Sequence, residues 1–229
     1  MFEAIIPLRS NSKGLKNKNI LIFKNKINLV NYTLKKIINI KKIKKIHILT
    51  DSNYYKKKII DHKKIDKNYQ RKKKLSLSNS KIDDLINDFL LNYNSNIKSN
   101  NFLLFQVTSP NLKKNEIIKF LNFINKNKVS SLMHVTEVLE NPYEIIEIKE
   151  KKWKHLMKKR VVNRQNYLKK FMFITGSLFF FTRNFFSKNK KIFNSKTYPY
   201  KIDRINFIDI DDKFTFELAK NNLNLKTRN

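Results

Sequence analysis

The chain has 229 residues, and its 41% hydrophobic and 12% aromatic content allows a substantial core, which excludes a disordered polycation despite the net charge of +32. No apolar run approaches the roughly 20 residues of a membrane span. The absence of cysteine excludes disulfides, a thiolate nucleophile and a Cys-based metal site.

The positive charge is weak evidence for a nucleic-acid partner. The lysine excess comes with many Asn, Ile and Phe residues along the whole chain, a set that A/T-rich codons produce. A nucleic-acid binder would instead concentrate Lys and Arg on one face with aromatics between them. We interpret the densest run, Gln70–Lys74, as a solvated loop, and a basic nucleic-acid-binding domain is kept as the alternative of a different class. With no signal peptide before the first strand, we expect a cytoplasmic protein without a membrane partner.

The apolar run Phe2–Leu8 predicts a strand buried on both faces, and a polar loop follows it. Backbone N–H groups in such a loop can form an anion-binding concavity, to which Arg adds a planar fork and Lys a point charge. The chain has only two glycines, Gly14 and Gly176, and we expect each where the backbone demands it. The loop therefore predicts a phosphate site, although its spacing fits neither GxxxxGK[ST] nor GxGxxG. Its candidate ligands are Arg9, Ser12, Lys13, Gly14, Lys18 and Asn19.

Alternating helical and strand patterns follow. Apolar spacing predicts helices over residues 28–40 and 53–60, with a strand over 44–49 that ends at Thr50-Asp51-Ser52. This β–α–β–α order predicts a parallel sheet with helices on both faces, which binds ligands at the carboxyl ends of its strands.

The polar residues 61–79 contain Arg71, either a ligand-facing arginine or part of a lysine-rich surface loop. Ser80 with Asp83 resembles a loose capping box for a helix through Leu90. A strand over 102–107 is closed by Gln106–Pro110, in which Gln106, Thr108 and Ser109 offer hydrogen-bond donors and acceptors. Ser109 could instead cap the helix predicted over 113–127.

Beyond a strand over 129–138, the alternation breaks at residues 141–172, and a strand over 173–181 surrounds Gly176. Strands over 198–202 and 205–208 lead to Asp209-Ile210-Asp211-Asp212 and a helix over 214–221. An extended Asp-x-Asp points both carboxylates to one face, and Mg²⁺ prefers carboxylates together with phosphate oxygens. The alternative is that Asp211 or Asp212 caps the helix.

These segments resemble one known family in order and spacing. Residues 5–20, IIPLRSNSKGLKNKNI, resemble the N-terminal signature of the acylneuraminate cytidylyltransferases, the CMP-sugar synthetases. That signature is a strand, Ile-Pro-x-Arg, a short polar step, Ser-Lys-Gly and a Lys-Asn pair. Further matches are Gln106–Pro110, Arg164-Gln165, Thr175–Ser177 and Asp209–Asp211, with Val107 replacing a usual Pro and Thr175 a usual Asn. The resemblance covers Ile5–Lys220.

By this resemblance the chain is a single Rossmann-like α/β nucleotidyltransferase domain over residues 1–229, with a mostly parallel sheet. Residues 141–172 would form a small excursion that crosses to the second subunit of a homodimer and helps close its active site. The substrates would be CTP and an acidic nine-carbon sugar, such as a neuraminate, legionaminate or pseudaminate derivative. An eight-carbon octulosonate is the alternative sugar.

The resemblance also implies roles for individual residues. The sugar's anomeric hydroxyl would attack the α-phosphorus and release pyrophosphate, its proton passing to an aspartate or to a hydroxide on the metal. Mg²⁺ would be held by Asp209 and Asp211. The catalytic residues would be Arg9, Lys13 and Asp211. The nucleotide-binding residues would be Arg9, Ser12, Lys13, Gly14, Lys18, Asn19 and Arg71. The sugar-binding residues would be Gln106, Thr108, Ser109, Arg164, Gln165 and Gly176.

Overall fold

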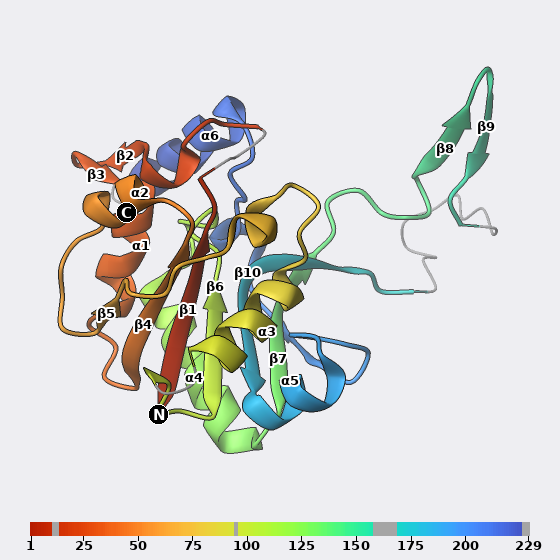
Figure 1. The fold of residues 1–229 in the computed structure, drawn as a ribbon. Coiled ribbons are helices and arrows are strands. Elements are labelled where there is room, and N and C mark those ends of the chain that lie inside the picture. Colours follow the sequence, from red (N-terminus) through yellow and green to blue (C-terminus); the bar gives the residue numbers. More distant parts are fainter. Residues whose placement is uncertain (11–13, 94–95, 158–168, 226–229) are drawn as a thin grey trace.

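The computed structural model describes residues 1–10, 14–93, 96–157 and 169–225. Its centre is a seven-stranded sheet in the order β11-β7-β10-β6-β1-β4-β5 (Figure 1). Every pairing is parallel except those of β10, which runs antiparallel to both β6 and β7. The predicted, mostly parallel α/β sheet is confirmed. The strands are β1 (Phe2–Leu8), β4 (Ile43–Thr50), β5 (Ile65–Asp66), β6 (Asn101–Phe105), β7 (Ser131–Glu137), β10 (Met172–Thr182) and β11 (Tyr198–Lys201).

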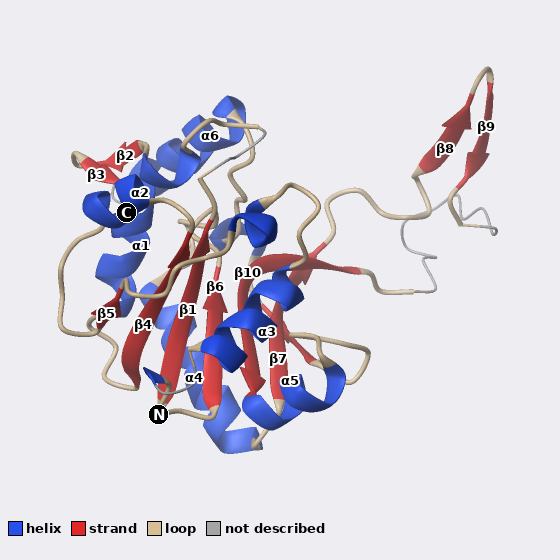
Figure 2. Cartoon of the chain, viewed as in Figure 1, coloured by secondary structure: helices blue, strands red, loops and turns tan. Residues whose placement is uncertain are grey.

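Helices cover both faces of the sheet (Figure 2). Four short segments lie outside the seven-stranded sheet. Between β1 and α1 the chain forms η1 (Lys18–Ile20), β2 (Ile22–Lys24) and β3 (Ile27–Asn28), and after β5 it forms η2 (Lys73–Ser76). The helices are α1 (Leu29–Ile37), α2 (Asn53–Lys58), α3 (Ile82–Asn92), α4 (Lys114–Asn127), α5 (Arg183–Asn189) and α6 (Lys213–Leu225). None of the helices in the described ranges combines the length and apolarity needed to cross a bilayer.

Three local predictions were wrong. Residues 205–208 form no strand; a short 3₁₀ helix, η5 (Arg204–Asn206), precedes an extended segment. Ser80 does not cap α3, because its hydroxyl donates to the carbonyl of Lys74. Ser109 does not cap α4, whose N-cap is Lys113.

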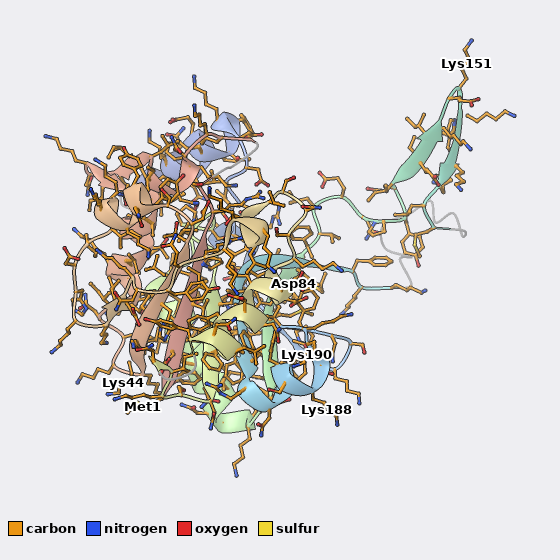
Figure 3. The ribbon with its side chains drawn as sticks, viewed as in Figure 1. Met1, Lys44, Asp84, Lys151, Lys188 and Lys190 are labelled. Carbon is orange, nitrogen blue, oxygen red and sulfur yellow. The ribbon has the colours of Figure 1, made fainter. Side chains whose placement is uncertain are left out.

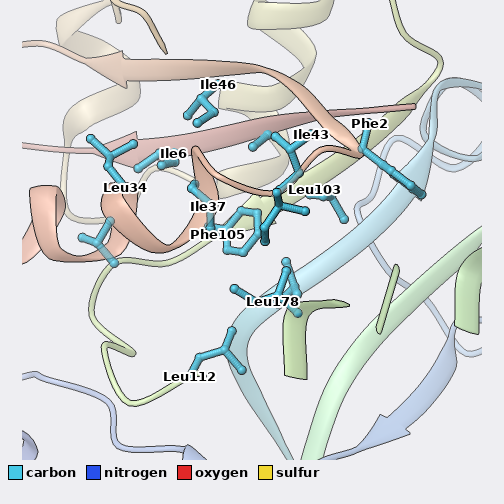
Figure 4. Close-up of a cluster of buried hydrophobic side chains, with 14 of the residues drawn as sticks. Phe2, Ile6, Leu34, Ile37, Ile43, Ile46, Leu103, Phe105, Leu112 and Leu178 are labelled. Carbon is cyan, nitrogen blue, oxygen red and sulfur yellow. The ribbon is translucent and has the colours of Figure 1, made fainter. Parts of the chain in front are cut away.

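Two apolar clusters sandwich the sheet. One joins α1 and α4 to alternate residues of β1, such as Ala4 and Ile6 (Figure 4). The other joins α3 and α5 to the opposite face, which includes Ile5. The continuous apolar run of β1 is therefore buried on both faces, as predicted. Lysines such as Lys44 in β4, and Lys188 and Lys190 at the end of α5, project outward (Figure 3).

A hairpin, β8 (Ile146–Lys149) with β9 (Lys152–His155), stands away from the sheet (Figure 1). It lies within residues 141–172, where the predicted alternation breaks. Its two faces differ, because Ile148 pairs with Trp153 on one side while Glu147 pairs with Lys154 on the other. Ile148 is 69% exposed and Trp153 is 62% exposed.

A polar cluster is buried at the amino end of β1. The Glu3 carboxylate contacts Nε2 of His47 at 2.6 Å and accepts the backbone N–H groups of Lys98 and Ser99 at 2.9 and 3.0 Å. Burial opposes the charge of Glu3, but these hydrogen bonds outweigh it and lower the pKa below its ordinary 4.5. Glu3 thus ties β1 to β4 and to the segment that enters β6.

We expect Glu3→Ala to reduce the free energy of unfolding by about 3 kcal/mol, because it leaves the backbone N–H groups of Lys98 and Ser99 without their acceptor. Because the folded pKa of Glu3 is lowered, its contribution is complete above pH 4.5 and is lost as the pH falls through the folded value. Urea unfolding at neutral pH and below pH 4.5 measures both effects. Asp61→Ala is the control, a surface change expected to stay within about 0.5 kcal/mol; an equal loss in both variants would contradict the prediction.

Candidate active site

A cavity of about 370 Å³ opens at the carboxyl ends of β1 and β6. Four residues predicted to bind the nucleotide line it: Arg9, Lys18, Asn19 and Arg71. Arg9 directly follows β1, and the side-chain amide of Asn19 donates to the carbonyl of Arg9 at 3.3 Å. The parallel sheet therefore delivers these side chains to the edge at which ligands bind in such folds.

Arg71 is buried rather than part of a surface loop. Its backbone N–H donates to the carbonyl of Thr50 at 3.1 Å, at the end of β4. Its Nε and Nη2 both donate to the carbonyl of Leu75, at 3.1 and 2.5 Å. Burial lowers the pKa of Arg71, while the charge of Asp51 favours the protonated form. The guanidinium is thus fixed in the wall of the cavity.

Gly14 and Lys18 join the first loop to the last extended segment. A Cβ at Gly14 would overlap the carbonyl oxygen of Asp211, so only glycine permits this approach. Lys18 Nζ donates to the carbonyl of Ile210 at 2.7 Å and to the carboxylate of Asp211 at 3.0 Å. Residues almost two hundred positions apart therefore form one wall of the cavity.

Asp209 and Asp211 both line the cavity. Burial raises the pKa of Asp209 and the charge of Asp211 adds to this rise, while a hydrogen bond with Thr108 and the charge of Lys18 oppose it. Oδ1 of Asp209 is buried and has no hydrogen-bond partner within the described part of the chain. The backbone N–H of Ile210 donates to the carbonyl of Thr108 at 2.8 Å, which fixes this segment against β6.

These two carboxylates fit a magnesium ion. Mg²⁺ keeps several waters and takes one or two protein carboxylates together with substrate phosphates. The described residues contain no group of three potential metal-binding side chains, so a phosphate substrate would have to complete the coordination. Asp212 is separate from this pair, because it accepts hydrogen bonds from the N–H and hydroxyl of Thr215 at 2.7 Å and caps α6. The capping alternative therefore holds for Asp212.

The end of β6 forms the opposite wall. Gln106 and Thr108 line the cavity. Gly176, at φ +71°, lies behind Gln106, where an added Cβ would be 3.4 Å from Oε1. Ser109 is buried and donates its N–H to the carbonyl of Gln106 at 3.3 Å. Ser109 and Gly176, both predicted to bind the sugar, are not among the residues that line the cavity.

Four predicted residues, Ser12, Lys13, Arg164 and Gln165, lie outside the described ranges, and their roles stay predictions. Sequence reasoning also missed a lysine with a structural role. Lys36 Nζ donates to the carbonyls of Pro110 and Leu112 at 2.5 and 3.1 Å, and burial lowers its pKa to about 7. Because lysine is so common in this chain, no sequence pattern distinguishes Lys36 from the surface lysines.

Comparison with known proteins gives one family. The family model described as Cytidylyltransferase matches residues 3–221. An N-acylneuraminate cytidylyltransferase of Streptococcus agalactiae serotype III is 27% identical over 215 residues, which cover 93% of this chain and 51% of the relative. Post-translational flagellin modification protein B of Campylobacter coli is 24% identical over 218 residues, 94% of this chain and 92% of the relative. The chain thus spans about half the length of the first of these relatives.

Solved structures share the fold at low identity. A CMP:2-keto-3-deoxy-manno-octonic acid synthetase complexed with CTP superimposes with a TM-score of 0.67 at 9% identity, covering 98% of this chain and 99% of that one. The 2-C-methyl-D-erythritol 4-phosphate cytidylyltransferase of Francisella tularensis gives a TM-score of 0.62 at 13% identity, covering 96% and 99%. At such low sequence identity, these structural matches support the fold and nothing further.

We expect Asp209→Asn to raise the melting temperature at neutral pH in EDTA by on the order of 2 °C, because burial disfavours the ionised side chain. Since the folded pKa of Asp209 is raised, the advantage of Asn should appear as the pH rises through the ordinary value of 3.8 and level off above the folded value. Asp211→Asn is the matched control. Asp211 is exposed and paired with Lys18, so its neutralisation should give no increase. A lower melting temperature for Asp209→Asn would show that its charge is not disfavoured.

Proposed function

This chain belongs to the cytidylyltransferase family, and from that premise we propose that it transfers the CMP group of CTP to an acidic nine-carbon sugar, releasing pyrophosphate. The observation that carries the proposal is one cavity that collects Arg9, Lys18 and Arg71 beside Asp209 and Asp211. A triphosphate needs the three cations, and the two carboxylates suit the Mg²⁺ that accompanies it. CTP chemistry also supports a cytoplasmic location.

The choice of a nine-carbon sugar rests on relatives rather than on contacts. The chain is 27% identical to a protein named N-acylneuraminate cytidylyltransferase, and it covers half of that protein. The octulosonate enzyme is a fold neighbour at 9% identity. Gln106 offers both a carbonyl and an amide to a polyhydroxylated substrate at the cavity wall.

In the proposed reaction the anomeric hydroxyl of the sugar gives its proton to a carboxylate or to water, and its oxygen forms a bond to the α-phosphorus of CTP. The bond from that phosphorus to the bridging oxygen breaks, and pyrophosphate leaves. Arg9 and Lys18 orient the phosphates and offset the charge on the leaving group, since such chemistry depends mainly on positioning and electrostatics. Asp209 and Asp211 would hold Mg²⁺, which supplies further charge neutralisation when bound.

Lys18 has a second role in this arrangement. Its ammonium contacts Asp211 at 3.0 Å and the carbonyl of Ile210 at 2.7 Å. It therefore holds the carboxylate-bearing segment beside the phosphate loop. Thr108 acts from the other side through the N–H of Ile210. Both contacts fix where Asp211 stands before substrate arrives.

We also propose a homodimer built through the β8–β9 hairpin. An isolated two-stranded hairpin is marginal in water, and this one exposes Ile146, Ile148 and Trp153 on a single face. Exposed apolar surface of this kind marks an interaction site, and a second copy is the commonest partner in soluble oligomers.

Pyrophosphate release from CTP tests the function. We expect release with a neuraminate, legionaminate or pseudaminate derivative, loss of release in EDTA, and recovery with added Mg²⁺. Asp211→Asn should lower turnover by at least about a hundredfold, since it removes one of two metal carboxylates. Asp212→Asn is the matched control, because the neighbouring side chain caps α6 and lies outside the cavity. Release with an octulosonate alone would overturn the nine-carbon assignment, and equal activity of the two variants would overturn the metal site.

The dimer is tested by light scattering. We expect the wild-type chain at micromolar concentration to have about twice the mass of one chain. Trp153→Glu should shift it toward monomer, because it places a charge on the apolar face of the hairpin. Lys152→Glu adds the same group to the opposite face and should leave the dimer intact. A wild-type monomer would rule out the dimer, and dissociation by both variants would place the interface elsewhere.

A further inference from the structure

The first residue after Arg9 is fixed by two side chains from another segment. Asp51 accepts the backbone N–H of Ser10 at 2.9 Å and its hydroxyl at 2.7 Å. The hydroxyl of Tyr55 donates to the carbonyl of Ser10 at 3.2 Å. All three polar groups of Ser10 are therefore bound, and the orientation of the peptide after Arg9 is determined.

The sheet explains why Asp51 and Tyr55 are available at this point. β1 and β4 are parallel, and Leu8 is in register with Thr50, so the residues that follow each strand lie side by side. Ser52 then caps α2 by accepting the N–H of Tyr55 at 3.2 Å, and its own N–H donates to the hydroxyl of Thr50 at 3.2 Å. The turn from Asp51 to Tyr55 is thereby held by its own hydrogen bonds.

Tyr55 also reaches the far end of the phosphate loop. Its single hydroxyl proton is shared between the carbonyl of Ser10 and the side-chain oxygen of Asn17, each 3.2 Å away, and Asn17 has a left-handed backbone at φ 55°. Lys18 follows Asn17 and carries the contacts to Asp211. Burial raises the pKa of Tyr55 to about 12, and the charge of Asp51 adds to this effect, so the hydroxyl stays a donor at neutral pH. One phenol thus contacts both described ends of the loop.

Asp51 is placed between cationic groups without lining the cavity. Its charge favours the protonated form of Arg71, whereas the charge of Arg9 opposes it. Arg9 and Arg71 both line the cavity and Asp51 does not, so its carboxylate can offset their repulsion without meeting the phosphates. Bound to Ser10 by two hydrogen bonds, it cannot swing toward a ligand without releasing the loop.

We propose that Asp51 and Tyr55 are positioning residues for nucleotide binding: by fixing Ser10 and Asn17 they hold Arg9 and Lys18 where the triphosphate of CTP is received. This inference rests on the proposed function and deepens it. Neither residue touches the reacting atoms. Both act through the loop that carries Arg9 and Lys18. A cation that is already held in place loses less conformational entropy when it binds a phosphate, so the affinity is higher.

The test measures CTP affinity by calorimetry and KM for CTP and for the sugar, with melting curves for every variant. Asp51→Ala should weaken CTP binding at least about tenfold, which corresponds to 1.4 kcal/mol. Tyr55→Phe should weaken it by about threefold, on the order of one neutral hydrogen bond. The KM for the sugar should stay within about twofold of wild type in both, since the loop meets only the nucleotide. Asp51→Asn keeps an oxygen for the N–H of Ser10 but loses the charge beside Arg71, so it should restore only part of the affinity.

Tyr54→Phe is the matched control, the same change one residue earlier on an exposed side chain. It should leave CTP affinity unchanged. Unchanged CTP affinity in Asp51→Ala and Tyr55→Phe, with lower melting temperatures, would overturn the inference and leave a structural role only. An equal loss in Tyr54→Phe would overturn it as well. A wild-type chain that binds neither CTP nor inorganic tripolyphosphate would overturn the proposed function as well as this inference. Failure of the inference alone is recognised because the wild-type chain still binds CTP and the Asp51 and Tyr55 variants bind it equally well.

Discussion

The cavity depends on contact between the first loop and the last extended segment of the domain. Lys18 binds Ile210 and Asp211, and Gly14 lies directly against the carbonyl of Asp211. β1 is near the middle of the sheet and residues 209–211 follow the last strand in the chain, so this contact joins the first and last parts of the domain. The site is therefore a product of the whole fold. Its two walls, the end of β1 and the end of β6, are connected by the N–H of Ile210 on the carbonyl of Thr108.

The charged residues that line the cavity differ from what the overall composition suggests. The net charge of +32 comes mainly from lysines, and those labelled in Figure 3 project outward from different elements. The cavity has a different balance of charge, because three cationic and two carboxylate side chains line it and Lys18 pairs with Asp211 at 3.0 Å. Such an arrangement suits a polyanion that arrives with a divalent cation rather than a nucleic-acid backbone. Family membership supports this reading over a basic nucleic-acid-binding domain.

The order of elements could be predicted from periodicity, but the direction of β10 could not. A continuous apolar run indicates burial on both faces and carries no sign of orientation, so the sequence predicted a strand over 173–181 without its direction. β5 has only two residues, too few for any periodic signal. For the site, Arg9, Lys18 and Asp211 were identifiable because rare residue types or known spacings mark them. The supporting roles of Lys36 and Asp51 were not, because each depends on a long-range hydrogen bond to a partner that lies far away in sequence.

The glycines show how strongly the site constrains the sequence. Among the described residues, six non-glycine positions adopt positive φ, including Asn17, Lys128 and Lys190. Each costs roughly 1–2 kcal/mol, so this chain accepts strain at turns where other proteins would use glycine. Only Gly176 keeps glycine at a positive φ, and it lies against Gln106. Gly14 is retained for a different reason, because any Cβ there would collide with the backbone of Asp211. Where dihedral strain is the only penalty, this chain uses other residues at turns; where a Cβ would collide with the backbone of a cavity-lining residue, as at Gly14, it has glycine.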